Sequence, residues 1–577
     1  MKSTQCIFLW LFLVIVNLCC GDLLFAQTSL GDRREEVQRD ISTQTDLLQE
    51  EKIAIAGREG APVIEEKKAP EVTAEEGPTF FVKKIVIEGN TLLTSEELLT
   101  YAAPFEGREL SFRELKAFAD LVSAEYLRNG YTTSRAYIPP QKITDGTVIV
   151  QVLEGIVGTI EVTGNRWFRE QVYRDALSFD TGNFLEIADL ENALREINTS
   201  PDRSVRAYLE PGTETGTTDV TLKAKDNFPL HASLEYNRRG TKLTHRSRYL
   251  LRLTDNNVFG FGDRLNTAFS FAEQSALLGG SFSYEFPWQK TGTLYRFDAS
   301  VARTRLQKEM RARGVNGEPF NLGFGVTQKL LETRHVKLDG AFGLEYKDSK
   351  TTVGGDKLSY DRSRVFVVGP RVTVNDRYGR TFGASDLHVG IPRILNGLDH
   401  HDSKASRVKS GGRFQYLTLN LARLQRLCFG ATFLMQAGGQ WSPYPLTALE
   451  QFYLGGMSSV RGYPESDSSG DSGYNFSTEV RVPPYFIPKT WRVVGYEDKT
   501  WRDAISLIGF IEGGRCFNLK RQEAFSLKNR TLLATGFGLR FYVTPDTNLQ
   551  FSVGYPFGDE STDKDRPQIQ LAARFGF

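Results

Sequence analysis

From about Asn227 onward, apolar and polar residues alternate along one segment after another. The clearest cases are Tyr295 to Val301, Val336 to Tyr346 and Leu417 to Leu421, in which apolar residues fall at every second position apart from Gly340. A period of two predicts β-strands with one apolar face, and helical periods are nearly absent here. Roughly 350 residues at about 22 per strand and turn give about 16 strands, since a tilted membrane strand needs about 9 to 11 residues. Residues 227–577 are therefore predicted to form a transmembrane antiparallel β-barrel.

A soluble β-sandwich or a large lectin-like domain would also show alternating strands. The repeated apolar face and the terminal aromatic segment Arg574 to Phe577 favour a membrane barrel. Beyond the first residues, the chain has no run of about 18 apolar residues, which excludes a helical membrane protein. Any part of this chain that crosses a membrane must therefore do so with strands.

Residues 79–154 show a different pattern of apolar and polar positions, which predicts a small α+β module. An apolar strand ends at Gly89-Asn90, and two helices follow, with Thr94 and Glu97, then Ser111 and Glu114, as their capping boxes. Strands are predicted near Thr132 to Ile138 and at Thr147 to Leu153, after the hairpin signal Asp145-Gly146. The predicted order is strand, helix, helix, strand, strand.

Residues 155–226 repeat this order, because Gly158 to Asn165 has the same Ile-x-Val/Ile-x-Gly-Asn pattern as Lys84 to Asn90. Helices are predicted near Arg166 to Leu177 and Ile187 to Ile197, and strands near Ser204 to Leu209 and Asp219 to Lys225. Small modules with unpaired strand edges are suited to peptide capture by strand addition.

The N-terminal part contains three further segments. Residues 1–26 have an early cation, an apolar run and Ala26-Gln27, which is the layout of a secretory signal peptide cleaved near Ala26; acylation at Cys19 or Cys20 is the alternative. Residues 31–52 are polar, with one thin apolar stripe at helical spacing. Residues 53–78 are rich in Gly, Pro and acidic pairs, as in a flexible linker.

Composition and local motifs limit the chemistry. The 71 basic and 70 acidic residues leave a net charge of +1, so no nucleic-acid partner is expected. Only Cys428 and Cys516 lie outside the signal segment, and two isolated strand cysteines are more often packed than paired. Asp399-His-His-Asp402 contains possible metal ligands, but adjacent residues on one loop seldom complete a metal site. With no nucleotide or hydrolase motif, neither enzyme activity nor a cofactor is expected.

Several motifs together resemble the two-partner secretion transporters of the haemolysin secretion/activation type, which are related to outer-membrane assembly factors. The resemblance spans the whole mature chain. It rests on Tyr131 to Pro139 and Asp145 to Gly155, similar to a first POTRA domain, on Leu209 to Leu222 in the second, and on Asp255 to Asp263 at the start of the barrel. The most specific match is Leu454-Gly-Gly-Met-Ser-Ser-Val-Arg-Gly-Tyr463, which resembles the family's Val-Arg-Gly-Tyr/Phe loop motif.

The resemblance implies a functional site in the barrel lumen. The loop motif Val460, Arg461, Gly462 and Tyr463 would lie inside the barrel, and a wall motif would comprise Gly509, Phe510, Glu512 and Gly514, with Glu512 in place of the usual Asp. Because a buried Arg needs a carboxylate, we expect Arg461 and Glu512 to pair and fix the loop. Gly462 would permit a tight turn, and Tyr463 would pack on the wall with a hydrated hydroxyl.

The implied function is export of a large partner protein from periplasm to cell surface. The two POTRA-like domains, in the periplasm of a Gram-negative-type bacterium, would hold the unfolded cargo, the barrel in outer-membrane lipid would pass it, and residues 31–52 would plug the lumen. Insertion of the barrel would itself require the barrel assembly machinery. An assembly factor that inserts other barrels remains the alternative, although such factors usually carry more POTRA domains.

Overall fold

The computed structural model of the chain describes residues 64–66, 79–143, 145–288, 291–333, 335–407, 409–493, 496–519, 529–544, 547–563 and 567–576. The segments predicted as signal peptide (1–26) and plug-like helix (31–52) lie outside these residues. Two compact units are present. One contains the POTRA-like domains with the short turn Asn256–Gly262, and the other contains the barrel strands.

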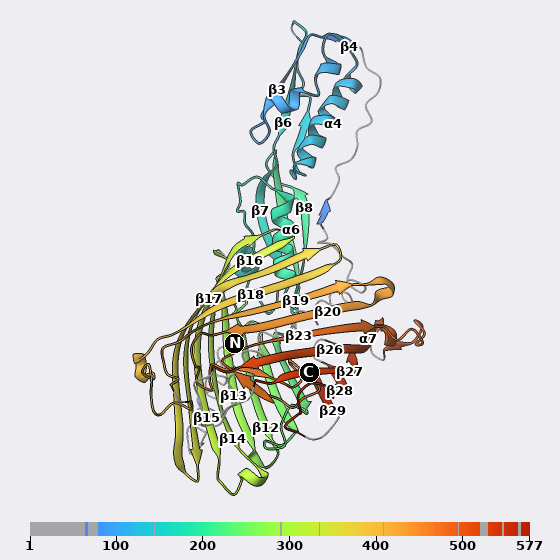
Figure 1. Ribbon diagram of the computed structural model, residues 1–577. Helices are drawn as coiled ribbons and strands as arrows, with labels where there is room; N and C mark the ends of the chain where they lie inside the picture. Colours follow the sequence, from blue (N-terminus) through green and yellow to red (C-terminus); the bar gives the residue numbers. More distant parts are fainter. Residues whose placement is uncertain are drawn as a thin grey trace. The chain divides into compact units, whose positions relative to one another are not determined.

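The first POTRA-like domain has the predicted order of strand, helix, helix, strand and strand, with one strand between the two helices that was not predicted (Figure 1). Its sheet consists of β3 (Lys84–Glu88), β6 (Thr147–Leu153) and β5 (Arg135–Tyr137), with β2 (Phe80–Val82) and β4 (Arg108–Leu110) as a separate pair. Both capping boxes form, at the starts of α3 (Ser95–Leu99) and α4 (Phe112–Arg128). The apolar face of α4 is buried against the sheet, as its spacing predicts.

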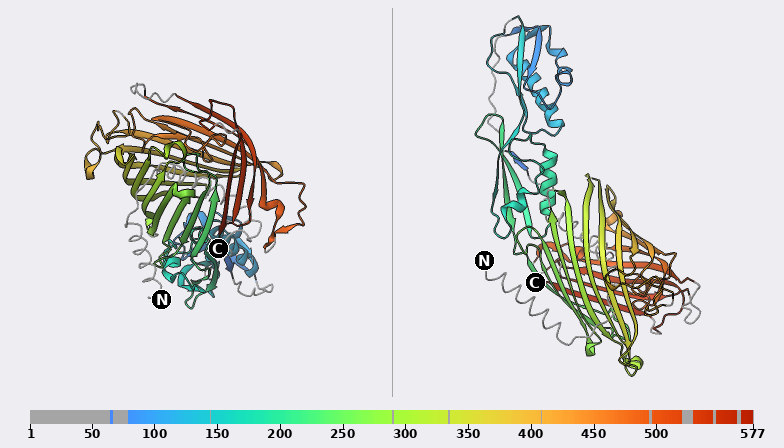
Figure 2. Two further views of the ribbon diagram at one scale, coloured as in Figure 1. Left: turned by 90° about the horizontal axis from the view of Figure 1, so that it is seen from below. Right: turned by 90° about the vertical axis from the view of Figure 1, so that its left-hand side faces the viewer.

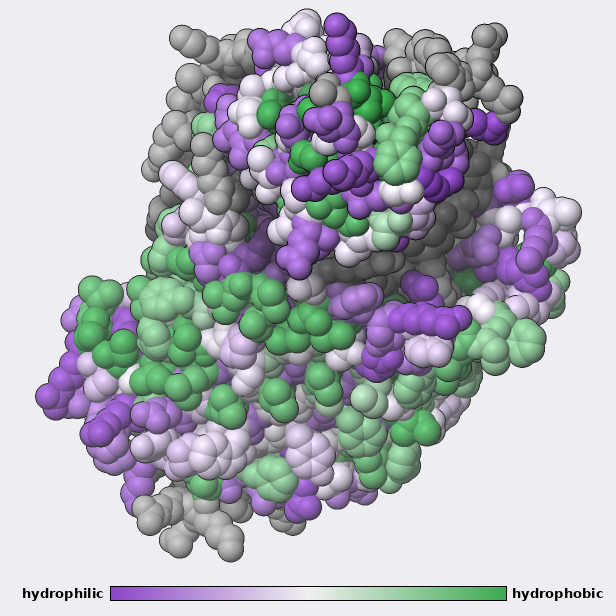
Figure 3. Space-filling model, turned by 90° about the horizontal axis from the view of Figure 1, so that it is seen from above, coloured by the Kyte–Doolittle hydropathy of each residue, from purple (hydrophilic) through white to green (hydrophobic). Residues whose placement is uncertain are grey.

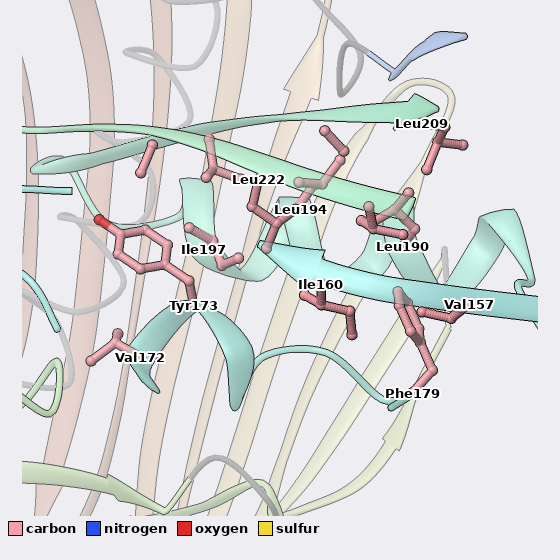
Figure 4. Packing of buried hydrophobic residues seen from close by; sticks show 14 of the residues in the cluster. Val157, Ile160, Val172, Tyr173, Phe179, Leu190, Leu194, Ile197, Leu209 and Leu222 are labelled. Atoms are coloured by element: carbon pink, nitrogen blue, oxygen red, sulfur yellow. The ribbon is translucent and has the colours of Figure 1, made fainter. Parts of the chain in front are cut away.

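The second domain repeats the arrangement with β7 (Ile156–Thr163), α5 (Glu170–Arg174), α6 (Ile187–Asn198), β8 (Arg203–Pro211) and β9 (Thr217–Asp226). Side chains from both helices and all three strands meet in one apolar cluster (Figure 4). Helix α5 is shorter than the predicted 166–177. The backbone N–H groups of residues 166–168 donate to the carboxylate of Asp226, which holds that stretch outside the helix.

The repeated Gly-Asn pair has the same role in both domains. Gly89 and Gly164 each have φ of +81°, and an added Cβ would lie 2.4 Å from a carbonyl oxygen of the neighbouring strand. After each pair, a carboxylate from the end of the last strand accepts the N–H groups of the turn. Glu154 has this position in the first domain, where it accepts from Thr91 and Leu92 at 2.7 Å, and Asp226 has it in the second.

Glu154 also accepts a hydrogen bond from the Tyr126 hydroxyl at 2.8 Å. Burial alone would raise the pKa of Glu154, but the hydrogen bonds from Leu92, Thr91 and Tyr126 stabilise its charged form and lower that pKa. The turn of the first domain is therefore held by an ionised carboxylate.

Part of the predicted linker is a strand. Within residues 53–78, β1 (Ile64–Glu66) pairs in parallel with β8 from Ala207 to Leu209, giving the sheet order β1-β8-β9-β7. Strand pairing uses backbone groups, so an edge strand accepts a segment whose composition is typical of a linker.

The barrel is closed and antiparallel, with 16 strands and with β10 paired to β29 (Figures 1 and 2). Its strands are β10 (Leu230–Asn237), β11 (Arg248–Asp255), β12 (Arg264–Ala272), β13 (Leu277–Trp288), β14 (Thr293–Arg305), β15 (Asn316–Glu332), β16 (Val336–Val353), β17 (Asp356–Asp376), β18 (Gly379–Gly390), β19 (Gln415–Arg426), β20 (Thr432–Trp441), β23 (Ser472–Val482), β26 (Ile505–Phe517), β27 (Thr531–Tyr542), β28 (Asn548–Pro556) and β29 (Gln568–Gly576). The predicted barrel of about 16 strands is confirmed.

The barrel strands bury their polar face and expose their apolar face. On β16, Glu345, Lys347 and Ser349 are buried, whereas Phe342 and Leu344 are exposed. Figure 3 shows patches of apolar side chains on the face of the barrel that is seen from above. None of the helices in the described ranges is long and apolar enough to cross a membrane. An apolar outer wall around a polar interior is the arrangement of a barrel in lipid.

Candidate functional site

The segment 442–471 joins β20 to β23 and carries the predicted loop motif. It forms a hairpin of β21 (Phe452–Leu454) and β22 (Ser468–Gly470), and Val460 and Tyr463 are fully buried. These residues pack with inward-facing side chains of the wall in one cluster: Phe452, Leu454, Val460, Tyr463, Cys516, Leu532 and Ala534. Because the last three belong to the inner face of β26 and β27, the loop folds back into the barrel lumen.

Arg461 meets Glu512 on β26 through three atoms. Its backbone N–H donates to Oε2 at 2.7 Å, Nε donates to Oε1 at 2.8 Å, and Nη2 lies 2.6 Å from Oε1. The guanidinium also covers the ring of Phe510 at 3.6 Å from its centroid, a cation–π contact. The structure thus brings together the two residues that the sequence singles out as a pair.

Both groups are almost wholly buried, Arg461 with 6% and Glu512 with 3% of their surface exposed. Two buried charges gain little net stability from each other, because each loses its hydration. Removing one partner, however, leaves the other charge buried and uncompensated, which typically costs about 3 to 5 kcal/mol. The pair therefore fixes the position of the loop more than it stabilises the barrel.

Sequence reasoning missed a second carboxylate. Arg461 Nη1 donates to Glu479 Oε2 on β23 at 2.7 Å, and Glu479 also binds Arg481 at 2.7 Å and Arg540 of β27 at 3.0 Å. Three guanidinium groups thus share the carboxylates of Glu479 and Glu512, beside a cavity of about 110 Å³. One signal was available, because Glu479 and Arg481 lie on the polar face of a strand whose other face is apolar.

Gly462 lies in a tight turn as predicted, whereas Tyr463 differs from the prediction. The Tyr463 N–H donates to the Val460 carbonyl at 3.1 Å, which closes the turn around Gly462, and a Cβ on Gly462 would lie 2.6 Å from the Ala534 Cβ. The Tyr463 side chain is fully buried, and its hydroxyl donates to the carbonyl of Asp559 at 2.9 Å, where a hydrated hydroxyl was predicted. Both residues press the motif against the wall formed by β27 and β28.

The wall motif lies on β26. Phe510, Glu512 and Gly514 face the lumen, and a Cβ on Gly514 would come within 2.9 Å of Leu454 in the loop. Gly509 faces outward, and nothing lies within 4 Å of an added Cβ. The structure gives no steric reason for a glycine at 509.

Further ion pairs anchor the loop to the barrel, and two of them involve Asp467 and Glu450. Asp467 pairs with Arg530 at 2.8 Å, and Glu450 accepts from Lys347 of β16 at 3.0 Å and from the Tyr416 hydroxyl of β19 at 2.8 Å. The loop is therefore anchored to strands on separate parts of the inner wall.

The other candidates of the sequence take ordinary positions. Asp399 pairs with Arg393 at 2.6 Å, and His400 stacks on His401. In the described residues, no group of three or more His, Cys, Asp or Glu side chains is placed to hold a metal ion. Cys516 is buried and packed, whereas Cys428 is exposed in the turn after β19, and the two are not joined in a disulfide.

Comparisons with known proteins agree with these features. Residues 80–155 match the POTRA domain of ShlB type, and residues 216–496 match the haemolysin secretion/activation protein family ShlB/FhaC/HecB. The outer membrane transporter CdiB of Escherichia coli O6:K15:H31 is 26% identical over 489 residues, which cover 82% of this chain and 81% of the relative. The heme/hemopexin transporter protein HuxB of Haemophilus influenzae is 23% identical over 498 residues, or 85% of each chain.

Among solved structures, CdiB from Escherichia coli has the same fold, with a TM-score of 0.70 and 24% identity over 96% of this chain and 100% of that one. This likeness shows that the two chains share a fold. The two matched family segments together span more than half of the chain. The chain therefore belongs to the haemolysin secretion/activation family ShlB/FhaC/HecB, the outer-membrane transporters of two-partner secretion, whose POTRA domains lie in the periplasm.

Proposed function

We propose that this transporter captures a large partner protein in unfolded form and passes it through the barrel lumen to the cell surface. The observation that carries the proposal is the polar lumen, occupied by a loop that charged side chains pin in place. Arg461, Glu479 and Glu512 hold the loop tip through charged contacts, beside the apolar cluster that contains Val460 and Tyr463. Polar contacts of this kind can be exchanged for water or for a passing chain as the loop moves.

The test is a deletion of the gene for the transporter. Loss of one large surface protein, with unchanged amounts of other outer-membrane barrels, is the expected result. A general fall in outer-membrane barrels would instead support the assembly-factor alternative. Matches to proteins named as transporters favour export.

The POTRA domains are proposed to capture cargo by strand addition. Pairing of β1 with β8 supports this, because the edge of the second sheet already accepts a strand from the same chain. In the described residues, β3 and β5 of the first domain each pair on one side only. Deletion of residues 84–154 is expected to stop secretion while the barrel still assembles, and normal secretion would contradict this role.

Residues 31–52 are proposed to plug the lumen, since a polar helix with a thin apolar stripe suits a water-filled pore. Their deletion is expected to raise ion conductance in planar bilayers without abolishing export. Unchanged conductance would place this segment outside the pore.

Two further partners complete the proposal. The outer wall contacts membrane lipid through exposed apolar residues such as Leu419 and Phe537. Insertion of this wall is proposed to depend on the barrel assembly machinery, and depletion of that machinery should leave the chain unfolded in the periplasm.

A further inference from the structure

Two connections at one end of the barrel expose large apolar side chains. The turn between β19 and β20 carries Leu427 and Phe429, and the connection from β23 to β26 carries Tyr485, Phe486 and Trp491. Phe429, Phe486 and Trp491 are 85%, 78% and 60% exposed. These five residues, here called the rim patch, belong to segments that touch, because the Tyr485 hydroxyl donates to the carbonyl of Phe429.

Chain direction places the rim patch on the periplasmic side. Strand β10 follows directly after the periplasmic domains, and every neighbouring pair in the barrel is antiparallel. Counting from β10, both β19 and β23 run toward the periplasmic edge. The rim patch therefore lies at the level of the inner leaflet of the outer membrane.

The rim patch continues the lipid-facing wall. On the outward faces of β20 and β23, Phe433 lies opposite Val480, and Val482 lies opposite Leu507 of β26, next to the residues that enter the patch. Helix α7 (Trp501–Ala504) of the same connection stacks Trp501 on Phe541 of β27 at 5.4 Å. Phe541 has the outward parity of the exposed Leu539, so the connection folds onto the outside of the barrel.

The backbone of the rim patch is strained at one residue. Phe429 has φ of +56°, a left-handed conformation that is costly for a bulky residue. In this conformation the ring of Phe429 points away from the protein. In water, neither the strain nor the exposure would be compensated, whereas burial of the ring in a lipid interface compensates both.

Cations surround the rim patch. Arg426, Lys489 and Arg492 are exposed, and the guanidinium of Arg502 covers the Tyr485 ring at 4.9 Å. Segments 426–431 and 483–504 contain five cations and three acidic residues. Aromatic rings flanked by Lys and Arg are the composition that binds at the interface of an anionic membrane.

We propose that the rim patch is a membrane-interface anchor, in which the aromatic side chains enter the periplasmic leaflet and Lys489 and Arg492 bind the headgroups of anionic phospholipids. Figure 1 shows the segment that contains α7 projecting from the side of the barrel. The inference rests on the proposal that the outer wall faces lipid, but not on the route of the cargo.

The native cysteines provide the test. Cys428, exposed beside Phe429, accepts an environment-sensitive fluorophore, while Cys516 is buried. The labelled full-length protein is reconstituted in vesicles of phosphatidylcholine with and without phosphatidylglycerol. Quenching by phospholipids with a shallow nitroxide is compared with quenching by aqueous iodide.

Strong quenching by the nitroxide lipid and weak quenching by iodide are expected, and phosphatidylglycerol should increase lipid quenching. Each basic residue at an anionic surface contributes up to about fivefold in binding. The double substitution Lys489→Glu and Arg492→Glu should abolish that increase, and Phe486→Ser with Trp491→Ser should restore quenching by iodide.

Two control labels, in a Cys428→Ser background, separate the possible failures. A label at Leu419→Cys reports the wall, and one at Leu358→Cys reports the opposite, extracellular edge. Iodide quenching at Cys428 with lipid quenching at Leu419→Cys would overturn the anchor alone, whereas loss of lipid quenching at both would overturn the lipid-facing wall. Equal quenching in both vesicle types would overturn the assignment to anionic headgroups. If the label at Cys428 became protected from iodide only after addition of cargo, the rim patch would be assigned to cargo binding, and the anchor would be overturned.

Discussion

Burial alternates along β6 in the first POTRA domain and along β16 in the barrel, but the two strands bury opposite kinds of side chain. On β6, Val148 and Val150 are fully buried in the domain core. On β16, Glu345 and Lys347 are buried and Leu344 is exposed. The sequence pattern predicts a strand in both cases, but it does not predict which face of the strand lies inside the protein.

The difference follows from the medium. In water, burial of apolar surface stabilises the POTRA domain, so its valines lie inside. In a membrane, the lipid tails are as apolar as the side chains, so an apolar residue gains little by moving into the protein interior. Every backbone N–H and C=O must still be hydrogen-bonded, and closure of the barrel achieves this. The same substitution at an exposed position should therefore have a different cost in the two regions.

The largest expected effect is in the lumen, where Arg461→Ala leaves Glu512 and Glu479 without their shared cation. Loop docking should lose about 3 to 5 kcal/mol where the site is fully buried, and less where water enters. Export should be lost while the protein stays in the outer membrane. Secretion and protease protection of the loop measure the two consequences.

A double-mutant cycle tests whether the contact is the cause. Arg461→Ala, Glu512→Ala and the double variant should be markedly non-additive, since the two side chains touch. Glu479→Gln forms a second cycle with the same arginine. Simple additivity in both cycles, or full export by Arg461→Ala, would show that the motif works by other means.

The next largest effect is expected for a leucine-to-lysine substitution in the barrel wall. Leu419 on β19 and Leu127 on α4 are matched for this test, because each is 57% exposed. Leu419→Lys should destabilise the barrel by about 2 to 4 kcal/mol near the membrane midplane, because the charge enters lipid. Leu127→Lys should change stability by no more than about 0.5 kcal/mol, since that position meets water. Urea unfolding of the reconstituted protein measures both, and equal costs would mean that the wall at Leu419 is not in lipid.

A smaller effect concerns Glu154, whose charged form holds the turn of the first POTRA domain. Its pKa is lower in the folded domain than the usual value of about 4.3, so its stabilisation is present above that pH and is lost as pH falls through the folded pKa. Glu154→Gln should cost about 1 to 3 kcal/mol at pH 7 and remove this acid sensitivity. Hydrogen exchange of the β6 amides in the full chain measures it, and an unchanged pH profile in the variant would assign the acid sensitivity to another group.

Local features of the fold were predictable from the sequence. The capping boxes at Thr94 and Ser111, the order of elements in both POTRA domains and the number of barrel strands depend on residues close together in the chain or on a simple period. The predicted pair of Arg461 and Glu512 came from family motifs, and neither periodicity nor spacing alone would have joined them.

What could not be predicted depends on register between distant segments. Glu479 reaches Arg461 only because β23 and β26 are paired so that Ser477 lies opposite Glu512. Helix α5 is short because Asp226, far along the chain, takes the N–H groups of its expected first turn. Strand β1 pairs through its backbone, which leaves little trace in side-chain pattern.

The smallest expected effect compares the loss of one methylene group in each region. Ile87→Val in the buried core of the first POTRA domain should lower the free energy of unfolding by about 0.5 to 1.5 kcal/mol, because the surrounding side chains leave a small void.

In the lumen, Glu512→Asp shortens the side chain by one methylene group and introduces the residue that is usual in the family motif. Water from the adjacent cavity can fill the space, but the carboxylate can no longer reach both the backbone N–H and the guanidinium of Arg461 without movement of the loop. We therefore expect most export to remain, with slightly weaker protease protection of the loop. Loss of export as complete as that of Arg461→Ala would show that the position of the carboxylate, and not its charge, fixes the loop.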